Sequence, residues 1–148
     1  AALLIVGILG ILLGVAPATT NTATSSRFTH VDVFIDPHGK PLAAYQFELR
    51  AAAGADVKLV GIEGGEHKAF LHPPYYDPKA LLSERIVIAS FNTGEDLPTT
   101  KTRVARLMVR ISGSGDPKFD TTLEVAASGD GKKIDGVTVT AVSQGATP

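Results

Sequence analysis

The chain has 148 residues, 44% of them hydrophobic and 20% charged, a composition typical of a folded domain and not of a disordered chain. Its 14 basic and 15 acidic residues are intermixed and form no basic stripe, so we expect no nucleic-acid partner. The absence of cysteine excludes disulfide bonds, cysteine-ligated metals and thiol catalysis.

The sequence begins with an uncharged apolar segment, AALLIVGILGILLGVA. We expect residues 1–18 to form one short hydrophobic helix, for which three interpretations stay open. The first is a membrane or assembly anchor, although sixteen helical residues rise only about 24 Å against a hydrocarbon core of roughly 30 Å. The second is a secretory signal segment, as the small residues of Ala16-Pro17-Ala18 indicate. The third is the stem of a pilin-like filament, although Ile5 stands where bacterial pilin stems carry a glutamate.

All three interpretations place the following domain outside the cytoplasm, in the periplasm or at the cell surface. Gly7, Gly10 and Gly14 recur at intervals of three and four residues, so they share one helix face on which another helix can pack closely. Self-association through this helix is therefore one expected contact, and a membrane is another. Residues 19–26 are rich in threonine and serine and are expected to form a polar tether.

From residue 27 to residue 148 the dominant hydrophobic period is two, which is the period of a half-buried strand. Tyr45, Phe47 and Leu49 alternate with polar residues, and the aliphatic residues of 103–111 alternate with arginines. The series Phe119, Thr121, Leu123 and Val125 alternates in the same way. Seven strands are predicted, over residues 31–35, 43–50, 57–62, 85–91, 103–111, 119–125 and 136–142. Gly, Pro and Asp turns separate them, so the prediction is an all-β sandwich of the jelly-roll or immunoglobulin-like type with about 7–9 strands.

The order of these patterns resembles that of cohesin-type modules over roughly residues 29–142. The segments that carry the resemblance are VDVFID, LAAYQFELR, VKLVGIEGG, RIVIASFNTG, TRVARLMVRISG and SGDGKKI. The resemblance implies a nine-stranded jelly-roll sandwich that holds another protein, usually a dockerin module, and that carries no catalytic residues. The sequence departs from that family in the inserted loop EHKAFLHPPYYDPKALLS, so we expect a different protein partner here.

The inserted loop contains the most distinctive candidate site. Pro73, Pro74 and Pro78 restrict the backbone around Tyr75 and Tyr76. Two adjacent tyrosines on an extended segment cannot both point into a core, so one or both are candidates for protein binding. The alternative is that the two rings close one end of the sandwich. The prolines at 73 and 74 belong to the same candidate protein-binding site.

Catalytic and metal-binding motifs give little support to an enzyme. His67 and His72 lie near Glu63, Glu66 and Asp77, but their spacing fits no helical metal-binding pair. The nucleophile pattern G-x-S-x-G is also missing from the sequence. We therefore expect no enzymatic activity, no catalytic residues, no metal and no cofactor.

The sequence thus predicts a non-catalytic interaction or scaffold module, anchored by its N-terminal helix as an accessory or structural subunit of a membrane-associated assembly of other protein subunits. The alternative is a pilin-like filament subunit whose helices bundle in the fibre core. A carbohydrate-binding module is a weaker alternative, because tryptophan is absent and aromatic residues make up only 6% of the chain.

Overall fold

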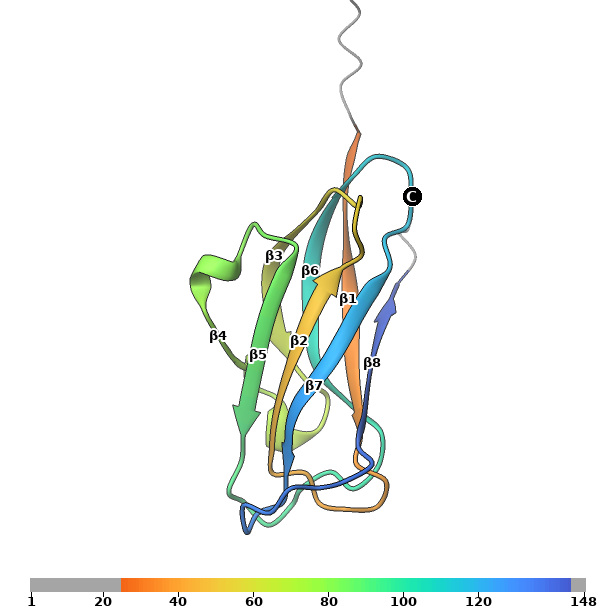
Figure 1. The fold of residues 1–148 in the computed structure, drawn as a ribbon. Helices are drawn as coiled ribbons and strands as arrows, with labels where there is room; N and C mark the ends of the chain where they lie inside the picture. Colours follow the sequence, from red (N-terminus) through yellow and green to blue (C-terminus); the bar gives the residue numbers. More distant parts are fainter. Residues whose placement is uncertain (1–24, 145–148) are drawn as a thin grey trace, which may run out of the picture.

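The computed structural model describes residues 25–144. The helix predicted over residues 1–18, with Gly7, Gly10 and Gly14, therefore lies outside the described residues, as does most of the predicted tether. The described part is a sandwich of two antiparallel four-stranded sheets (Figure 1). Its strands are β1 (Ser26–Asp36), β2 (Ala44–Ala51), β3 (Val57–Gly64), β4 (Tyr75–Tyr76), β5 (Arg85–Phe91), β6 (Thr102–Ser112), β7 (Phe119–Ala127) and β8 (Thr138–Ser143).

The strand order is β3-β6-β1-β8 in one sheet, named sheet A here, and β4-β5-β2-β7 in the other, named sheet B. The chain crosses between the sheets at every connection except the one from β4 to β5. The predicted all-β sandwich is confirmed, with eight strands among the described residues. The cohesin resemblance implies nine strands. Here β1 is a single strand of 11 residues that pairs with β6 along its length and with β8 over its second half.

The core lies between the sheets, as the alternation of the sequence predicts. Tyr45, Phe47 and Leu49 of β2 are buried and face the buried aliphatic residues of β1 and β6. The Tyr45 hydroxyl donates a hydrogen bond to the carbonyl of Val104, at 3.1 Å, so its polar atom is satisfied inside the core. Burial raises the pKa of the Tyr45 phenol.

One feature of β7 contradicts simple alternation. Gln46 of β2 is opposite Val125, but the next residue, Phe47, is opposite Leu123, so Glu124 is an extra residue in a β-bulge. The bulge reverses the phase of the strand, which exposes Val125 and buries Ala126. The prediction that Val125 shares a face with Phe119 and Leu123 is therefore wrong.

The segment between β4 and β5 forms an arch, defined here as residues 77–84, which leaves sheet B and reaches the edge of sheet A. A 3-10 turn spans Pro78–Ala80, and the Asp77 carboxylate accepts a hydrogen bond from the Lys79 N–H. Leu82 then donates its backbone N–H to the Leu59 carbonyl, and the Leu59 N–H donates to the Ser83 carbonyl. The arch therefore covers the edge of β3 at Leu59.

The outer face of sheet A carries a buried ion pair. Asp32 of β1 is only 4% exposed, and Arg106 of β6 binds both of its carboxylate oxygens, with Nε at 2.7 Å and Nη2 at 2.9 Å. Arg103 and His30 lie farther from the carboxylate, at 3.9 and 4.0 Å. The hydrogen bonds from Arg106 hold the pKa of Asp32 below its usual range. No helix within residues 25–144 is long and apolar enough to cross a membrane.

Candidate protein-binding surface

Tyr75 and Phe91 form an exposed aromatic pair on the outer face of sheet B. Their ring centroids are 6.0 Å apart and their planes are inclined by 10°, so the two rings are stacked. Tyr75 is 67% exposed and Phe91 62% exposed, which leaves most of both rings in contact with solvent. Each ring restricts the rotamers of the other, so the pair is already ordered before any partner arrives.

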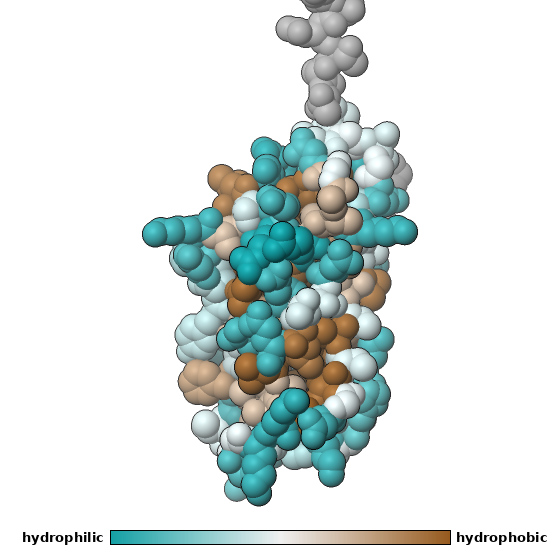
Figure 2. Space-filling view, viewed as in Figure 1, coloured by the Kyte–Doolittle hydropathy of each residue, from teal (hydrophilic) through white to brown (hydrophobic). Residues whose placement is uncertain are grey.

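Strand pairing extends this aromatic pair into a mainly apolar area, which Gln46 interrupts between Ala89 and Val125. Tyr75 is opposite Ala89, Ala89 is opposite Gln46, and Gln46 is opposite the exposed Val125, all in one row across the sheet. Phe91 is opposite Ala44 in the next row. Figure 2 shows brown apolar atoms in the lower half of this face, with teal polar side chains among them. We call this area the Tyr75 surface; its residues are Ala44, Tyr75, Val87, Ala89, Phe91 and Val125.

A charged cluster borders the Tyr75 surface toward the start of β5. Arg85 donates to the Glu48 carboxylate at 2.5 Å, and Arg50 donates to the same carboxylate at 3.1 Å. These hydrogen bonds, with Arg85 as the larger cause, hold the pKa of the half-buried Glu48 below its usual range. The apolar area is therefore bordered on this side by charges that already have partners, the arrangement of core and rim found in protein interfaces.

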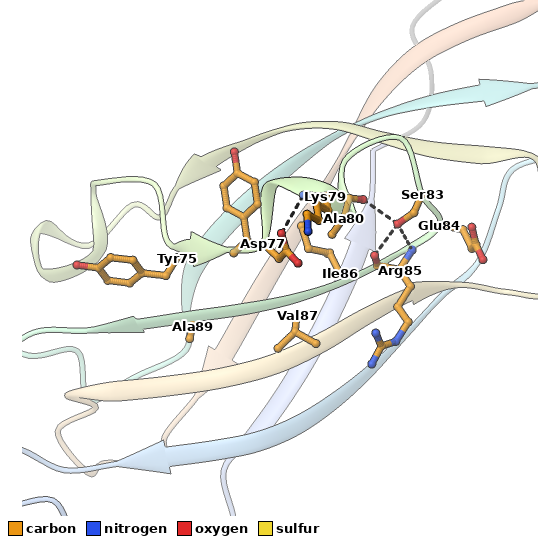
Figure 3. A pocket seen from close by; sticks show the side chains of 11 residues that line it. Tyr75, Asp77, Lys79, Ala80, Ser83, Glu84, Arg85, Ile86, Val87 and Ala89 are labelled. Atoms are coloured by element: carbon orange, nitrogen blue, oxygen red, sulfur yellow. Dashed lines mark hydrogen bonds between the residues drawn. The ribbon is translucent and has the colours of Figure 1, made fainter.

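A groove of about 760 Å³ lies between the arch and β5, next to the Tyr75 surface. Figure 3 shows Tyr75 at one end of the groove and Glu84 and Arg85 at the other. The Ser83 hydroxyl oxygen lies 2.7 Å from the carbonyl oxygens of Ala80 and of Arg85, either of which can accept its one proton. The same oxygen accepts the Arg85 N–H at 3.2 Å, which ties the arch to β5. The groove wall is therefore held by hydrogen bonds at the end remote from Tyr75.

The structure separates the four residues of the predicted site. Tyr75 points outward, whereas Tyr76 is half-buried and packs against the core, because successive residues of a strand face opposite sides. Pro73 is exposed and Pro74 is buried. The prediction that this segment lies outside every strand is wrong, since Tyr75 and Tyr76 form β4 and pair with β5.

Sequence reasoning missed Phe91 as part of the surface. The sequence places this residue at the end of the strand predicted over residues 85–91, and only the pairing of β4 with β5 brings it against Tyr75. Its place at the end of an apolar run, directly before the polar segment that starts at Asn92, was the only available signal.

The histidines of the inserted loop have other partners. His67 Nδ1 accepts the backbone N–H of Ala69 at 3.2 Å and caps the 3-10 turn Lys68–Phe70. Its Nε2 lies 3.8 Å from Asp96 Oδ1. His72 is exposed. Within residues 25–144 no three histidine, aspartate or glutamate side chains are grouped so that they could hold a metal ion.

Comparison of the chain with models of protein families, with curated proteins and with solved structures found no match.

Proposed function

We propose that this protein is a non-catalytic interaction module that binds another protein subunit through the Tyr75 surface. The observation that carries the proposal is the stacked and exposed pair of Tyr75 and Phe91, set among small and aliphatic side chains of sheet B. Large aromatic anchors in an apolar patch with a charged rim are the main source of affinity in protein interfaces. Burial of two preordered rings costs little side-chain entropy.

The cohesin resemblance supports the same class of function, because those modules hold other proteins on a β-sandwich. We further propose that residues 1–18 anchor the sandwich outside the cytoplasm, as an accessory or structural subunit of a membrane-associated assembly. In the pilin-like alternative the same segment bundles in the core of a filament. A polysaccharide ligand fits the Tyr75 surface less well, because Ala89 and Ala44, which are opposite Tyr75 and Phe91, offer no side-chain hydrogen bonds to sugar hydroxyls.

The test is a purification of the full chain from its native membranes in mild detergent, followed by identification of the chains present at a fixed ratio. The informative variant is the double substitution Tyr75→Ala and Phe91→Ala. The matched control is Phe28→Ala, because Phe28 is equally exposed, at 66%, but lies on sheet A. We expect the wild type and the control to retain a partner at a fixed ratio. The double variant should bind this partner roughly thirtyfold more weakly, because loss of an aromatic anchor typically costs about 2 kcal/mol of binding free energy.

Three results would contradict the proposal. The first is a wild-type chain that purifies without any other protein at a fixed ratio. The second is equal partner binding by the double variant and the Phe28→Ala control. The third is a long homopolymer of this chain alone, which would favour the filament alternative. Because both substituted rings are largely exposed, the double variant should keep its thermal transition, which separates loss of binding from loss of folding.

A further inference from the structure

Three of the four edge strands of the sandwich carry features that prevent pairing with another chain. The edge of β3 is covered at Leu59 by the arch. β4 has only two residues, and prolines stand on both sides of it. β7 carries the bulge at Glu124 together with outward charges at Asp120 and Glu124. Bulges, charges, prolines and covering loops are the usual means by which sheet edges avoid association.

Among the residues that the structure describes, the fourth edge strand, β8, has none of these features. Its sequence, TVTAVS, contains no charged residue and no proline, and it pairs with β1 in a six-residue register without a bulge. The Gln144 N–H donates to the His30 carbonyl of β1. This bond shows which alternate residues of β8 direct their backbone N–H and C=O groups to β1. The backbone groups of Val139, Ala141 and Ser143 therefore point away from β1, toward the edge of sheet A. The Val139 carbonyl accepts a hydrogen bond from the Thr121 hydroxyl of β7 at 3.3 Å, which leaves its second lone pair for a further donor. Four of the six residues are β-branched, which favours further strand pairing.

The hydrophobic core is also incompletely covered beside β8. Partly exposed hydrophobic residues line the seam between β7 and β8, where the two sheets meet without a ladder of strand hydrogen bonds. They are Phe119, Leu123, Val137, Val139 and Ala141. On the outer face of β8, Val142 is exposed as well. An additional strand on this edge would remove apolar surface from water along the seam.

We propose that β8 pairs antiparallel with β8 of a second copy of this chain, so that sheet A continues across a twofold axis. The edge fits its own copy because an uncharged strand places no like charges opposite each other. With the axis at Ala141, Val139 is opposite Ser143 of the other copy, and these three residues direct their backbone groups at the partner. Thr140 is then opposite Val142 of the other copy, and the two exposed seams face each other across the axis.

The test uses disulfide formation in the full chain, which contains no cysteine of its own. Two differently tagged chains, one with Thr140→Cys and the other with Val142→Cys, are co-expressed and oxidised mildly. In the proposed register the two positions form a pair without hydrogen bonds, with Cα atoms about 4.5 Å apart, close enough for a disulfide. Either variant paired with itself has a diagonal separation of about 7–8 Å, too long for one.

We expect a covalent dimer from the mixed chains and little from either variant alone. The second readout is the variant Thr140→Lys combined with Val142→Lys. It should lower the affinity of β8 for β8 of a second copy by on the order of tenfold or more, because lysines of the two copies are then opposite each other. The matched control is Thr122→Lys on the outer face of β7, which should leave cross-linking and association unchanged.

The mixed cysteine pair distinguishes the β8 contact from association through residues 1–18. Association through residues 1–18 alone would not place residue 140 of one copy next to residue 142 of the other. Absence of the mixed disulfide in folded chains would overturn the proposal, as would equal cross-linking by Thr140→Cys alone. Tyr75→Ala with Phe91→Ala lies on sheet B and should not affect the disulfide, so the proposal can fail or succeed independently of the proposed function.

Discussion

Replacing Phe47 by alanine tests the assignment of the core directly. Phe47 lies on the central strand β2, has no exposed surface, and stacks on Tyr45 with centroids 5.8 Å apart. Loss of the burial of its ring costs about 2 kcal/mol, and the cavity left among close-packed neighbours adds about 1–3 kcal/mol. We therefore expect Phe47→Ala to reduce the free energy of unfolding by about 3–5 kcal/mol, which lowers the Tm of a domain of this size by about 10–20 °C.

The sequence provides a matched control with the same chemical change. Phe91→Ala also removes a phenyl ring, but from an exposed position, so its cost should stay below about 1 kcal/mol. Urea unfolding followed by circular dichroism gives both values, with the slope of the transition as a check on two-state behaviour. A loss below about 1 kcal/mol for Phe47→Ala, or equal losses for the two variants, would refute the assigned faces of sheet B.

Three further predictions concern the ion pair and a glycine. Arg106→Ala leaves the buried Asp32 carboxylate without its main partner and should cost about 1–3 kcal/mol, since Arg106 is partly exposed and Arg103 and His30 remain near the carboxylate. Asp32→Ala combined with Arg106→Ala should cost less than the two single losses added together, as a double-mutant cycle would show. Because the pKa of Asp32 is lowered in the folded state, its contribution is present above the unfolded pKa of about 3.9 and is lost as the pH falls through the folded value. Urea unfolding between pH 5 and pH 2 should therefore show a larger loss of stability in the wild type than in the double variant, which keeps the other carboxyl groups of lowered pKa, such as Glu48. Gly64→Ala should cost about 1–3 kcal/mol, because a Cβ there collides with the backbone carbonyl of Leu71, while Gly115→Ala, with open space around it, should be close to neutral in the same thermal melt.

The sequence predicts those parts of the fold that depend on local periodicity. Tyr45, Phe47 and Leu49 follow a strict period of two on a strand with a buried face, and all three are buried. The inversion of Val125 could not be predicted, because the bulge at Glu124 is a property of the pairing between β7 and β2 and not of either strand alone. β4 was not among the predicted strands, since its two residues, Tyr75 and Tyr76, are too few for a periodic pattern.

The candidate site was predictable only in part, for a similar reason. The prolines and adjacent tyrosines of the inserted loop are visible in the sequence, and they directed attention to Tyr75. The contact between Tyr75 and Phe91 joins residues on two strands through a specific register, which no local pattern contains. The same holds for Asp32 and Arg106, which are 74 positions apart and meet only because β1 pairs with β6.

The position of the Tyr75 surface relative to the N-terminal segment bears on both proposals. β1 starts at Ser26 at one end of the sandwich and runs to Asp36 at the other, and Figure 1 shows β5 running in the same sense, so that Phe91 lies at the end remote from Ser25. Eleven residues of extended strand span about 36 Å. If residues 1–18 hold the chain at a membrane, the Tyr75 surface is then presented about one strand length from the attachment point. Antiparallel pairing of β8 with β8 of a second copy reverses the second copy along this axis, so the Ser26 ends of the two copies lie at opposite ends of the pair. A pair attached to one membrane through both N-terminal segments would therefore lie with its strands along the membrane surface.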